Sequence, residues 1–122
     1  MYIENTQLEN FTANQQLISS VMRKNGLECT GAWDFERMTF DRRFDIKEGT
    51  FYLRVFAEAK SGIIDPDAGS ATISLLKPAL GKYYYPHGVE YDDEVFPTHL
   101  VKKCEQILAN VQKELSSHIV HI

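Results

Sequence analysis

The chain has 122 residues, of which 43% are hydrophobic and 25% are charged, and its formal net charge is −4. These proportions are typical of a single globular domain over residues 1–122 and exclude a disordered, collagen-like or low-complexity chain. The excess of acidic residues argues against a nucleic-acid binder, whose affinity depends on neutralising phosphates with Lys and Arg.

The sequence also predicts the compartment. It contains no run of about 20 apolar residues, the length that a transmembrane helix needs. The first residues, MYIENTQLENF, lack the basic start and apolar core of a signal peptide. Cys29 and Cys104 lie far apart and outside any CxxC pair. We therefore expect a cytoplasmic protein with no membrane segment, no disulfide and no cysteine-based metal site.

The first predicted helix covers residues 13–25. Thr12 and Gln15 have the spacing of a capping box, with Thr12 as the N-cap. Gly26, directly after Asn25, is typical of a helix C-terminus. Between these ends, the apolar residues fall on one helical face: Leu17, Ile18, Val21 and Met22.

Four strands are predicted after this helix, over residues 28–34, 36–46, 50–60 and 70–77. The second and third alternate apolar and polar residues, and Lys47-Glu48-Gly49 between them indicates an antiparallel hairpin. Arg42 interrupts the apolar face of its strand. Either its side chain extends to an edge of the sheet, or a β-bulge shifts the alternation there. We expect Trp33 in the core, and Pro78 ends the fourth strand.

The last predicted helix covers residues 97–117, with Pro97 at the first helical position. Its apolar residues form one continuous stripe: Leu100, Val101, Cys104, Ile107, Leu108, Val111 and Leu115. The element order α-β-β-β-β-α predicts an α+β fold. We expect a two-layer sandwich in which a four-stranded antiparallel sheet carries the N-terminal and C-terminal helices on one face.

The opposite face of the predicted sheet is charged and partly aromatic. The alternation places on it Arg37, Thr39, Asp41, Arg43, Asp45, Tyr52, Arg54, Phe56, Glu58, Thr72, Ser74 and Leu76. Opposite charges on neighbouring strands can pair there. Two-fold dimers are the commonest oligomers, so Tyr52, Arg54 and Phe56 form a candidate homodimer interface.

The segment 81–93, GKYYYPHGVEYDD, concentrates tyrosines, carboxylates, one histidine and one lysine. Pro86 and Gly88 predict a loop, and loops on a rigid scaffold often carry binding function. Tyrosine suits this role because it joins a large apolar body to a polar tip. The candidate binding residues are Lys82, Tyr83, Tyr85, His87, Glu90 and Tyr91. The alternative is that the loop only closes the edge of the core.

These observations support two functional hypotheses. The first is a non-enzymatic interaction or ligand-binding module that acts as a homodimer, because no catalytic constellation is recognisable. The alternative is a small enzyme at residues 82–91, with His87 as general acid or base, Glu90 orienting it, and Lys82 or Tyr85 stabilising charge. No Gly-rich phosphate loop, GxSxG or HExxH motif occurs, so we expect no cofactor and no metal site.

Two stretches carry a resemblance to a known family: GAWDFERMTFDRRF (31–44) and LLKPALGKYYYPHGVEYDDEVFPTHLVKKC (75–104). Together with ENTQLEN near the N-terminus, they are similar to the YugN-like family, small proteins found chiefly in Bacillus and related Firmicutes. The resemblance covers nearly the whole chain. It implies a cytoplasmic bacterial protein with a compact α+β fold, and it makes the tyrosine- and histidine-rich segment a family feature. It implies no activity, cofactor or catalytic residue.

Overall fold

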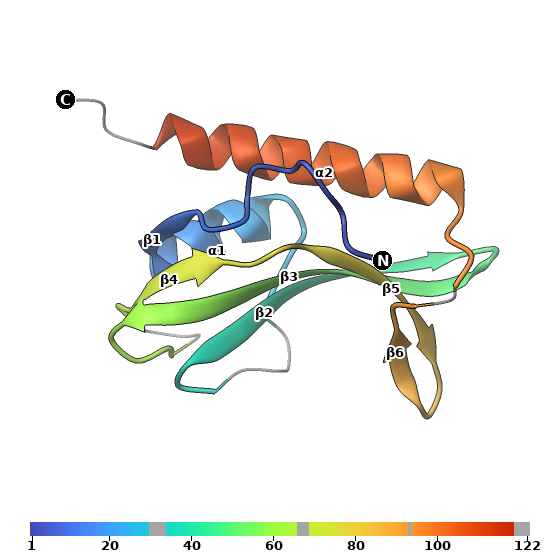
Figure 1. Ribbon diagram of the computed structural model, residues 1–122, viewed down its shortest axis with the longest axis horizontal. Helices are drawn as coiled ribbons and strands as arrows, with labels where there is room; N and C mark the ends of the chain where they lie inside the picture. The colour runs from blue at the N-terminus through green and yellow to red at the C-terminus, as the bar shows by residue number, and fades with distance from the viewer. Residues whose placement is uncertain (30–33, 66–68, 93, 119–122) are drawn as a thin grey trace.

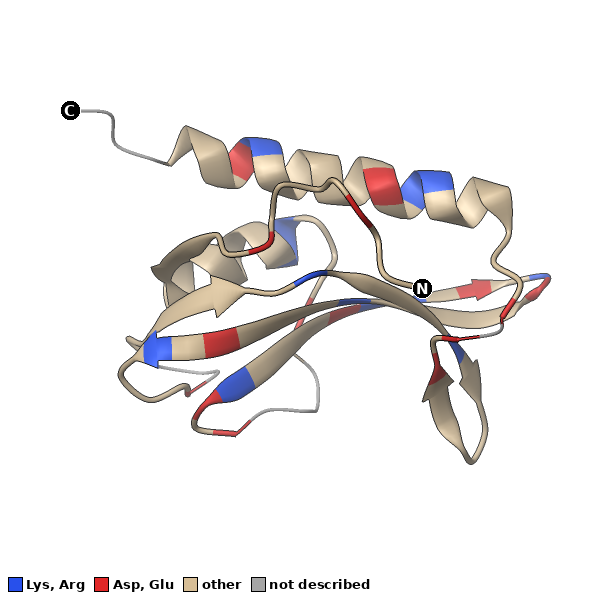
Figure 2. Cartoon of the chain, in the orientation of Figure 1, with Lys and Arg blue, Asp and Glu red and all other residues tan. Residues whose placement is uncertain are grey.

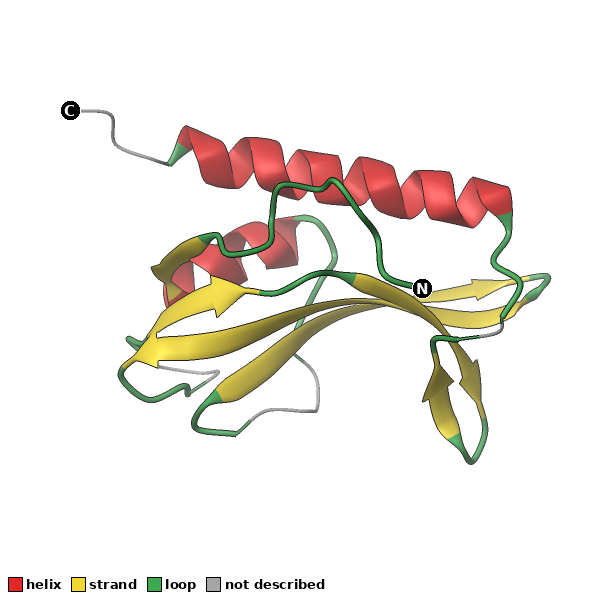
Figure 3. Cartoon of the chain, in the orientation of Figure 1, coloured by secondary structure: helices red, strands yellow, loops and turns green. Residues whose placement is uncertain are grey.

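The computed structural model describes residues 1–29, 34–65, 69–92 and 94–118. The elements in these ranges are β1 (Thr12–Asn14), α1 (Gln15–Lys24), β2 (Arg37–Ile46), β3 (Gly49–Ser61), β4 (Thr72–Leu75), β5 (Ala79–Tyr84), β6 (Gly88–Glu90) and α2 (Thr98–Ser117). Figures 1 and 3 show both helices on one face of the antiparallel sheet, so the α+β sandwich is confirmed. The described sheet has six strands, not the four predicted.

The long strand β3 organises the sheet. Along one edge it pairs with β2 in unbroken register, from Glu58 opposite Arg37 to Gly49 opposite Ile46. Along its other edge it pairs first with β5 and then, further along, with β4. β1 and β6 extend the sheet beyond β4 and β5, respectively. The predicted hairpin of residues 36–46 and 50–60 is therefore confirmed, and the predicted fourth strand is shorter, ending at Leu75.

The sequence predicted a loop over residues 81–93, but β5 and β6 occupy much of this segment and form a hairpin. Residues 79–84 form β5 because their backbone finds partners on β3, with Leu80 opposite Leu53. The chain then reverses through residues 85–87 into β6, where Val89 lies opposite Tyr83. Turn residues such as Pro86 and Gly88 are typical of a hairpin connection as well as of a longer loop. Asp93 lies outside the described residues.

The first predicted strand is also corrected. Within residues 28–34, Glu28 forms an isolated bridge to Asp41, with backbone hydrogen bonds of 3.0 and 2.8 Å. Residues 30–33, and with them the predicted core position of Trp33, lie outside the described residues.

The N-terminus of α1 differs from the predicted capping box. Thr12 lies in β1, where its hydroxyl donates to the Ser74 hydroxyl at 3.0 Å. The cap is Asn14, whose side-chain oxygen accepts from the backbone N–H of Gln16 at 2.8 Å. Gln15 is buried, and its amide donates to the Asp65 carbonyl at 2.7 Å. Because β1 pairs with β4, the helix begins at Gln15 and not at residue 13 as predicted.

Arg42 extends to an edge of the sheet, and the described β2–β3 register contains no bulge. Its Nη1 donates to the carbonyl of Asn25, the C-cap of α1, at 3.1 Å. The guanidinium carbon lies 5.2 Å from the centroid of the Phe44 ring. A cation on the apolar face is tolerated because it meets a helix C-terminus, where the dipole favours positive charge.

The core lies between the sheet and the two helices. α2 contributes its predicted stripe, buried at Leu100, Cys104, Ile107, Leu108, Val111 and Leu115. The sheet contributes buried residues from its alternating positions: Met38, Phe40, Phe44, Phe51, Leu53, Val55, Ala57, Ile73, Leu75 and Leu80. Pro97 is the N-cap of α2, not its first helical residue, because its ψ of 135° is extended.

Candidate functional site on the open face of the sheet

We call the sheet face opposite the two helices the open face. The cross-strand pairs that the register places on it include Asp41 opposite Arg54, Arg43 opposite Tyr52 and Thr39 opposite Phe56. Figure 2 shows acidic and basic residues interspersed along β2 and β3. In Figure 1 the sheet curves, and the β5–β6 hairpin projects from one end, away from the helices. The hairpin therefore stands at one end of the open face.

Arg54 is the best-anchored charge on the open face. Its Nε and Nη2 donate to the two carboxylate oxygens of Asp41 at 2.8 and 2.9 Å, and its Nη1 donates to the Tyr91 hydroxyl at 3.0 Å. Burial acts to lower the pKa of Arg54, but the hydrogen bond and charge of Asp41, helped by Tyr91, outweigh it and raise the pKa. The expected cross-strand pairing of opposite charges is confirmed at this pair.

The hairpin brings tyrosines onto the same face. Tyr83 meets Tyr52 edge to face, with ring centroids 6.0 Å apart and an interplanar angle of 73°. Gly81, on β5, is buried beneath Val89 and Tyr91, where a Cβ would meet Val89 Cγ1 and come within 2.9 Å of Tyr91 Cδ1. Tyr83 and Tyr91 of the segment 82–91 therefore share one surface with Tyr52 and Arg54 of β3.

The other residues of the predicted segment do not take part in the contacts among Tyr83, Tyr52, Arg54 and Tyr91. Lys82 lies on the helix side of the sheet, with Nζ 5.8 Å from the Phe51 ring centroid. Glu90, opposite Lys82 in the register, is exposed. Tyr85 and His87 are exposed in the turn, Tyr85 at 84%. No hydrogen bond or ion pair among the described residues joins His87 to Glu90, so these two side chains are not arranged as an acid–base pair.

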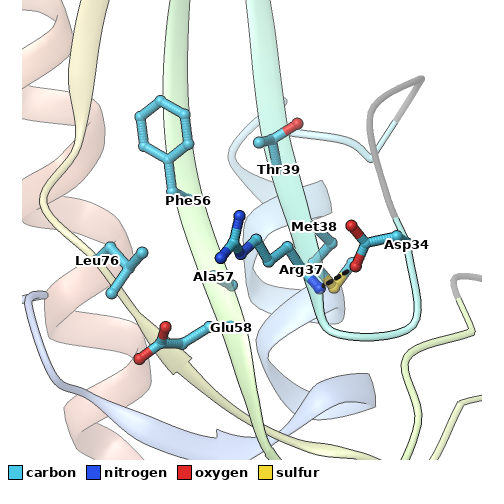
Figure 4. A pocket seen from close by; sticks show the side chains of 8 residues that line it. All are labelled: Asp34, Arg37, Met38, Thr39, Phe56, Ala57, Glu58 and Leu76. Atoms are coloured by element: carbon cyan, nitrogen blue, oxygen red, sulfur yellow. Dashed lines mark hydrogen bonds between the residues drawn. The ribbon is translucent and has the colours of Figure 1, made fainter.

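Two adjoining cavities lie on the open face at the end away from the hairpin. The first, shown in Figure 4, has a volume of about 550 Å³ and is lined by Asp34, Arg37, Met38, Thr39, Phe56, Ala57, Glu58 and Leu76. The second, about 450 Å³, is lined by Tyr2, Glu9, Asn10, Phe56, Leu76 and Lys77. Phe56 and Leu76 line both, so the two form one groove with an apolar centre. Volumes of this size fall in the range of small-molecule and side-chain pockets.

The carboxylates around the first cavity form hydrogen bonds or ion pairs within the chain. Asp34 accepts hydrogen bonds from the backbone N–H groups of Glu36 and Arg37 at 2.7 and 2.8 Å. These bonds favour the ionised form and lower the pKa of Asp34. Glu58 is paired with Lys60 at 3.0 Å. The groove therefore has an apolar centre and a charged rim.

Sequence reasoning found part of this groove and missed the rest. Phe56 and Leu76 could be assigned to the open face from strand alternation. Tyr2, Glu9 and Asn10 could not, because they reach the groove through the N-terminal segment, where Tyr2 forms a bridge to Ala79. Pairing between the chain start and an interior strand leaves no periodic signal in the sequence.

Among the described residues, no group of three or more His, Cys, Asp or Glu side chains is arranged to hold a metal ion. No helix in the described part of the chain has the length and hydropathy needed to cross a membrane.

Fold and site together define a small two-layer α+β domain with an uncovered, aromatic and charged sheet face. The family model of the YugN-like family matches residues 4–116, and the chain belongs to this family. It is 41% identical over 111 residues to the uncharacterized protein YlbA of Bacillus subtilis (strain 168), covering 90% of this chain and 91% of that protein. The resemblance inferred from the sequence is confirmed.

A solved structure agrees with this assignment. The crystal structure of the uncharacterized conserved protein YugN from Geobacillus kaustophilus HTA426 is 42% identical in sequence and has a TM-score of 0.83. The similarity covers 97% of this chain and 96% of that one. The fold is therefore shared along almost the whole length of both chains.

Proposed function

We propose that this protein is a non-enzymatic interaction module that works as a homodimer through the open face of its sheet, in the cytoplasm. The observation that carries the proposal is the groove centred on Phe56 and Leu76. In this two-layer fold both helices cover the other face, and a second copy would complete the burial of the groove. The rim contains both signs of charge, which a two-fold axis can bring into opposite-sign contacts.

The arrangement of the polar residues supports binding over catalysis. Arg54 is hydrogen-bonded to Asp41 and Tyr91. Its charge is therefore paired, and its side chain is oriented, before any partner binds. The centres of protein interfaces are enriched in Arg and Tyr side chains. His87, the residue that an enzymatic mechanism would use, is exposed at the hairpin turn and away from this cluster.

The test is the mass of the protein in solution. Native mass spectrometry and light scattering should give twice the 14.0 kDa of one chain. The variant carrying Tyr52→Glu and Phe56→Glu should be a folded monomer, because it places two charges in the interface. The matched control is Lys102→Glu with Lys113→Glu, two exposed positions on α2, which should stay dimeric.

Circular dichroism keeps the interpretation clear, since a loss of the dimer counts only where the helix and strand signals are unchanged. A wild-type chain that remains at 14.0 kDa at high concentration, or a double variant that dimerises as well as wild type, would refute the proposed interface. A small-molecule adduct that the wild type retains in native mass spectra and the double variant loses would instead identify the groove as a ligand site.

A further inference from the structure

The tip of the β5–β6 hairpin, residues 83–89, is an exposed and mainly aromatic projection that we call the knob. Residues 83–89, YYYPHGV, contain no carboxylate, and their basic residue is His87. Tyr85 is 84% exposed, and its hydroxyl makes no hydrogen bond to the described residues. An aromatic ring held this far out of the protein surface is typical of an anchor that fills a pocket on a partner.

The structure holds this knob in a defined position. The edge-to-face contact of Tyr83 with Tyr52 and the hydrogen bond from Arg54 to Tyr91 tie both strands of the hairpin to the open face. Val89 packs against Gly81, where a side chain larger than hydrogen would be in the way. Figure 1 shows the hairpin projecting to the side of the sheet opposite the helices. The knob is therefore presented on the open face before any partner binds.

The groove and the knob lie at opposite ends of the same face. β5, which leads into the hairpin, pairs with β3 at Phe51–Arg54, whereas β4 pairs with β3 from Ala57 onward. The groove is lined by residues of that second half, including Ala57 and Glu58. One chain thus carries a knob at one end of its open face and an apolar pocket at the other.

This pair of features is self-complementary under two-fold symmetry. When two open faces oppose each other about an axis that crosses β3 between the groove and the hairpin, each knob lies over the groove of the other copy. We propose that in the homodimer each copy inserts Tyr85 into the groove over Phe56 and Leu76 of the second copy. The inference rests on the proposed function and identifies the contact that holds the two copies together.

Charge agrees with this placement. The groove rim carries both signs of charge, with Asp34 and Glu58 near Arg37 and Lys77. The knob carries His87 within it and Glu94 beside it, where Glu94 accepts a hydrogen bond from the Tyr84 hydroxyl at 2.7 Å. A second copy can therefore set opposite signs against each other on both sides of the inserted ring. Phe56 and Leu76 then supply the apolar contact for the tyrosine ring, and the rim offers the tyrosine hydroxyl acceptors for a hydrogen bond.

An engineered disulfide tests the contact directly. We would combine Lys77→Cys, at the rim of the groove, with His87→Cys, in the hairpin turn, in a Cys29→Ser background. This choice leaves Tyr85, Phe56 and Leu76 in place. Within one chain the two positions are separated by β5, a span on the order of 25–30 Å, and a disulfide requires Cα atoms within about 7 Å. Oxidation should therefore give a reductant-sensitive covalent dimer. The control pairs His87→Cys with Val95→Cys, which is 88% exposed but outside the groove, and should stay monomeric on the same gel.

A mixing experiment provides the second test. Tyr85→Glu removes the knob, and Leu76→Glu places a charge in the groove, so each variant alone should lose the dimer. In a mixture of the two variants, Tyr85 of the Leu76→Glu chain can enter the intact groove of the Tyr85→Glu chain. One of the two insertions of the wild-type dimer is then restored. A heterodimer should appear in native mass spectra of the mixture, at an abundance below that of the wild-type dimer.

The outcomes separate this inference from the proposed function. If the protein is a dimer that Tyr52→Glu with Phe56→Glu abolishes, but the disulfide forms no faster than in the Val95 control, the open face is the interface and Tyr85 does not enter the groove. If the dimer forms and resists both sets of variants, the proposed function and the inference both fail.

Discussion

The guanidinium of Arg42 donates a hydrogen bond to the carbonyl of Asn25, 3.1 Å away, and so ties the sheet to the C-terminal end of α1. This contact predicts that Arg42→Ala destabilises the protein by about 1–3 kcal/mol, the range for losing a charged hydrogen-bond partner at a half-buried site. The free energy of unfolding in urea measures it.

The matched control is Arg43→Ala. Arg43 is the next residue, points to the open face and pairs with the exposed Asp45 at 3.1 Å. Surface ion pairs contribute little, so this change should have the smaller effect. An Arg42→Ala variant as stable as Arg43→Ala would show that the contact with Asn25 contributes nothing.

A substitution at Gly81 tests how closely Val89 and Tyr91 pack on β5. Gly81→Ala should destabilise the protein by about 1–3 kcal/mol, as overpacking does, because the added methyl meets Val89 and Tyr91. Adding Val89→Ala to this variant clears the space and should recover part of the loss. Thermal unfolding of the two single variants and the double variant gives the coupling. Additive effects would contradict the packing of Val89 on Gly81.

Cys104 should be chemically inert in the folded state. Burial raises the pKa of its thiol to about 12, and the thiolate is the reactive species. At pH 8, iodoacetamide should therefore modify Cys104 only after unfolding. Cys29 is half-buried, and burial raises the pKa of its thiol as well, so we expect slow but measurable labelling of Cys29. Peptide mass spectrometry of native and urea-unfolded samples distinguishes the two sites, and rapid native labelling of Cys104 would contradict its burial.

The lowered pKa of Asp34 predicts that the free energy of unfolding falls in acid. Hydrogen bonds from the backbone N–H groups of Glu36 and Arg37 lower its pKa from the ordinary 3.8. The unfolded state therefore binds the proton more readily, and the stability that Asp34 contributes is present above pH 3.8 and is lost as the pH falls through the folded pKa.

Asp34→Ala removes this contribution at every pH. Urea midpoints of wild type and variant should differ at pH 6 and converge as the pH falls below 3.8. A gap that stays constant down to the folded pKa would show that the carboxylate is not what stabilises the turn at residues 34–37.

Much of the fold follows from local patterns. The alternation in residues 36–46 and 50–60 and the helical stripe from Leu100 to Leu115 identified β2, β3 and α2, because side-chain period reports which face is buried. The same alternation placed Phe56 and Arg54 on the open face. The capping pattern at Thr12 gave a wrong start for α1, because a strand pairing between Thr12 and Ser74 competes with the cap.

The sequence alone determined the class of fold, the family and the residues of the two alternating strands, since each depends on short-range periodicity or on sequence similarity. Only the tertiary structure decided that residues 79–90 form a hairpin, that Tyr83 packs on Tyr52, and that Leu76 and Tyr2 meet across one groove. These features depend on which distant backbone segments hydrogen-bond to each other. Such pairing is chosen by the whole chain, because each strand edge accepts the partner that also buries its apolar face.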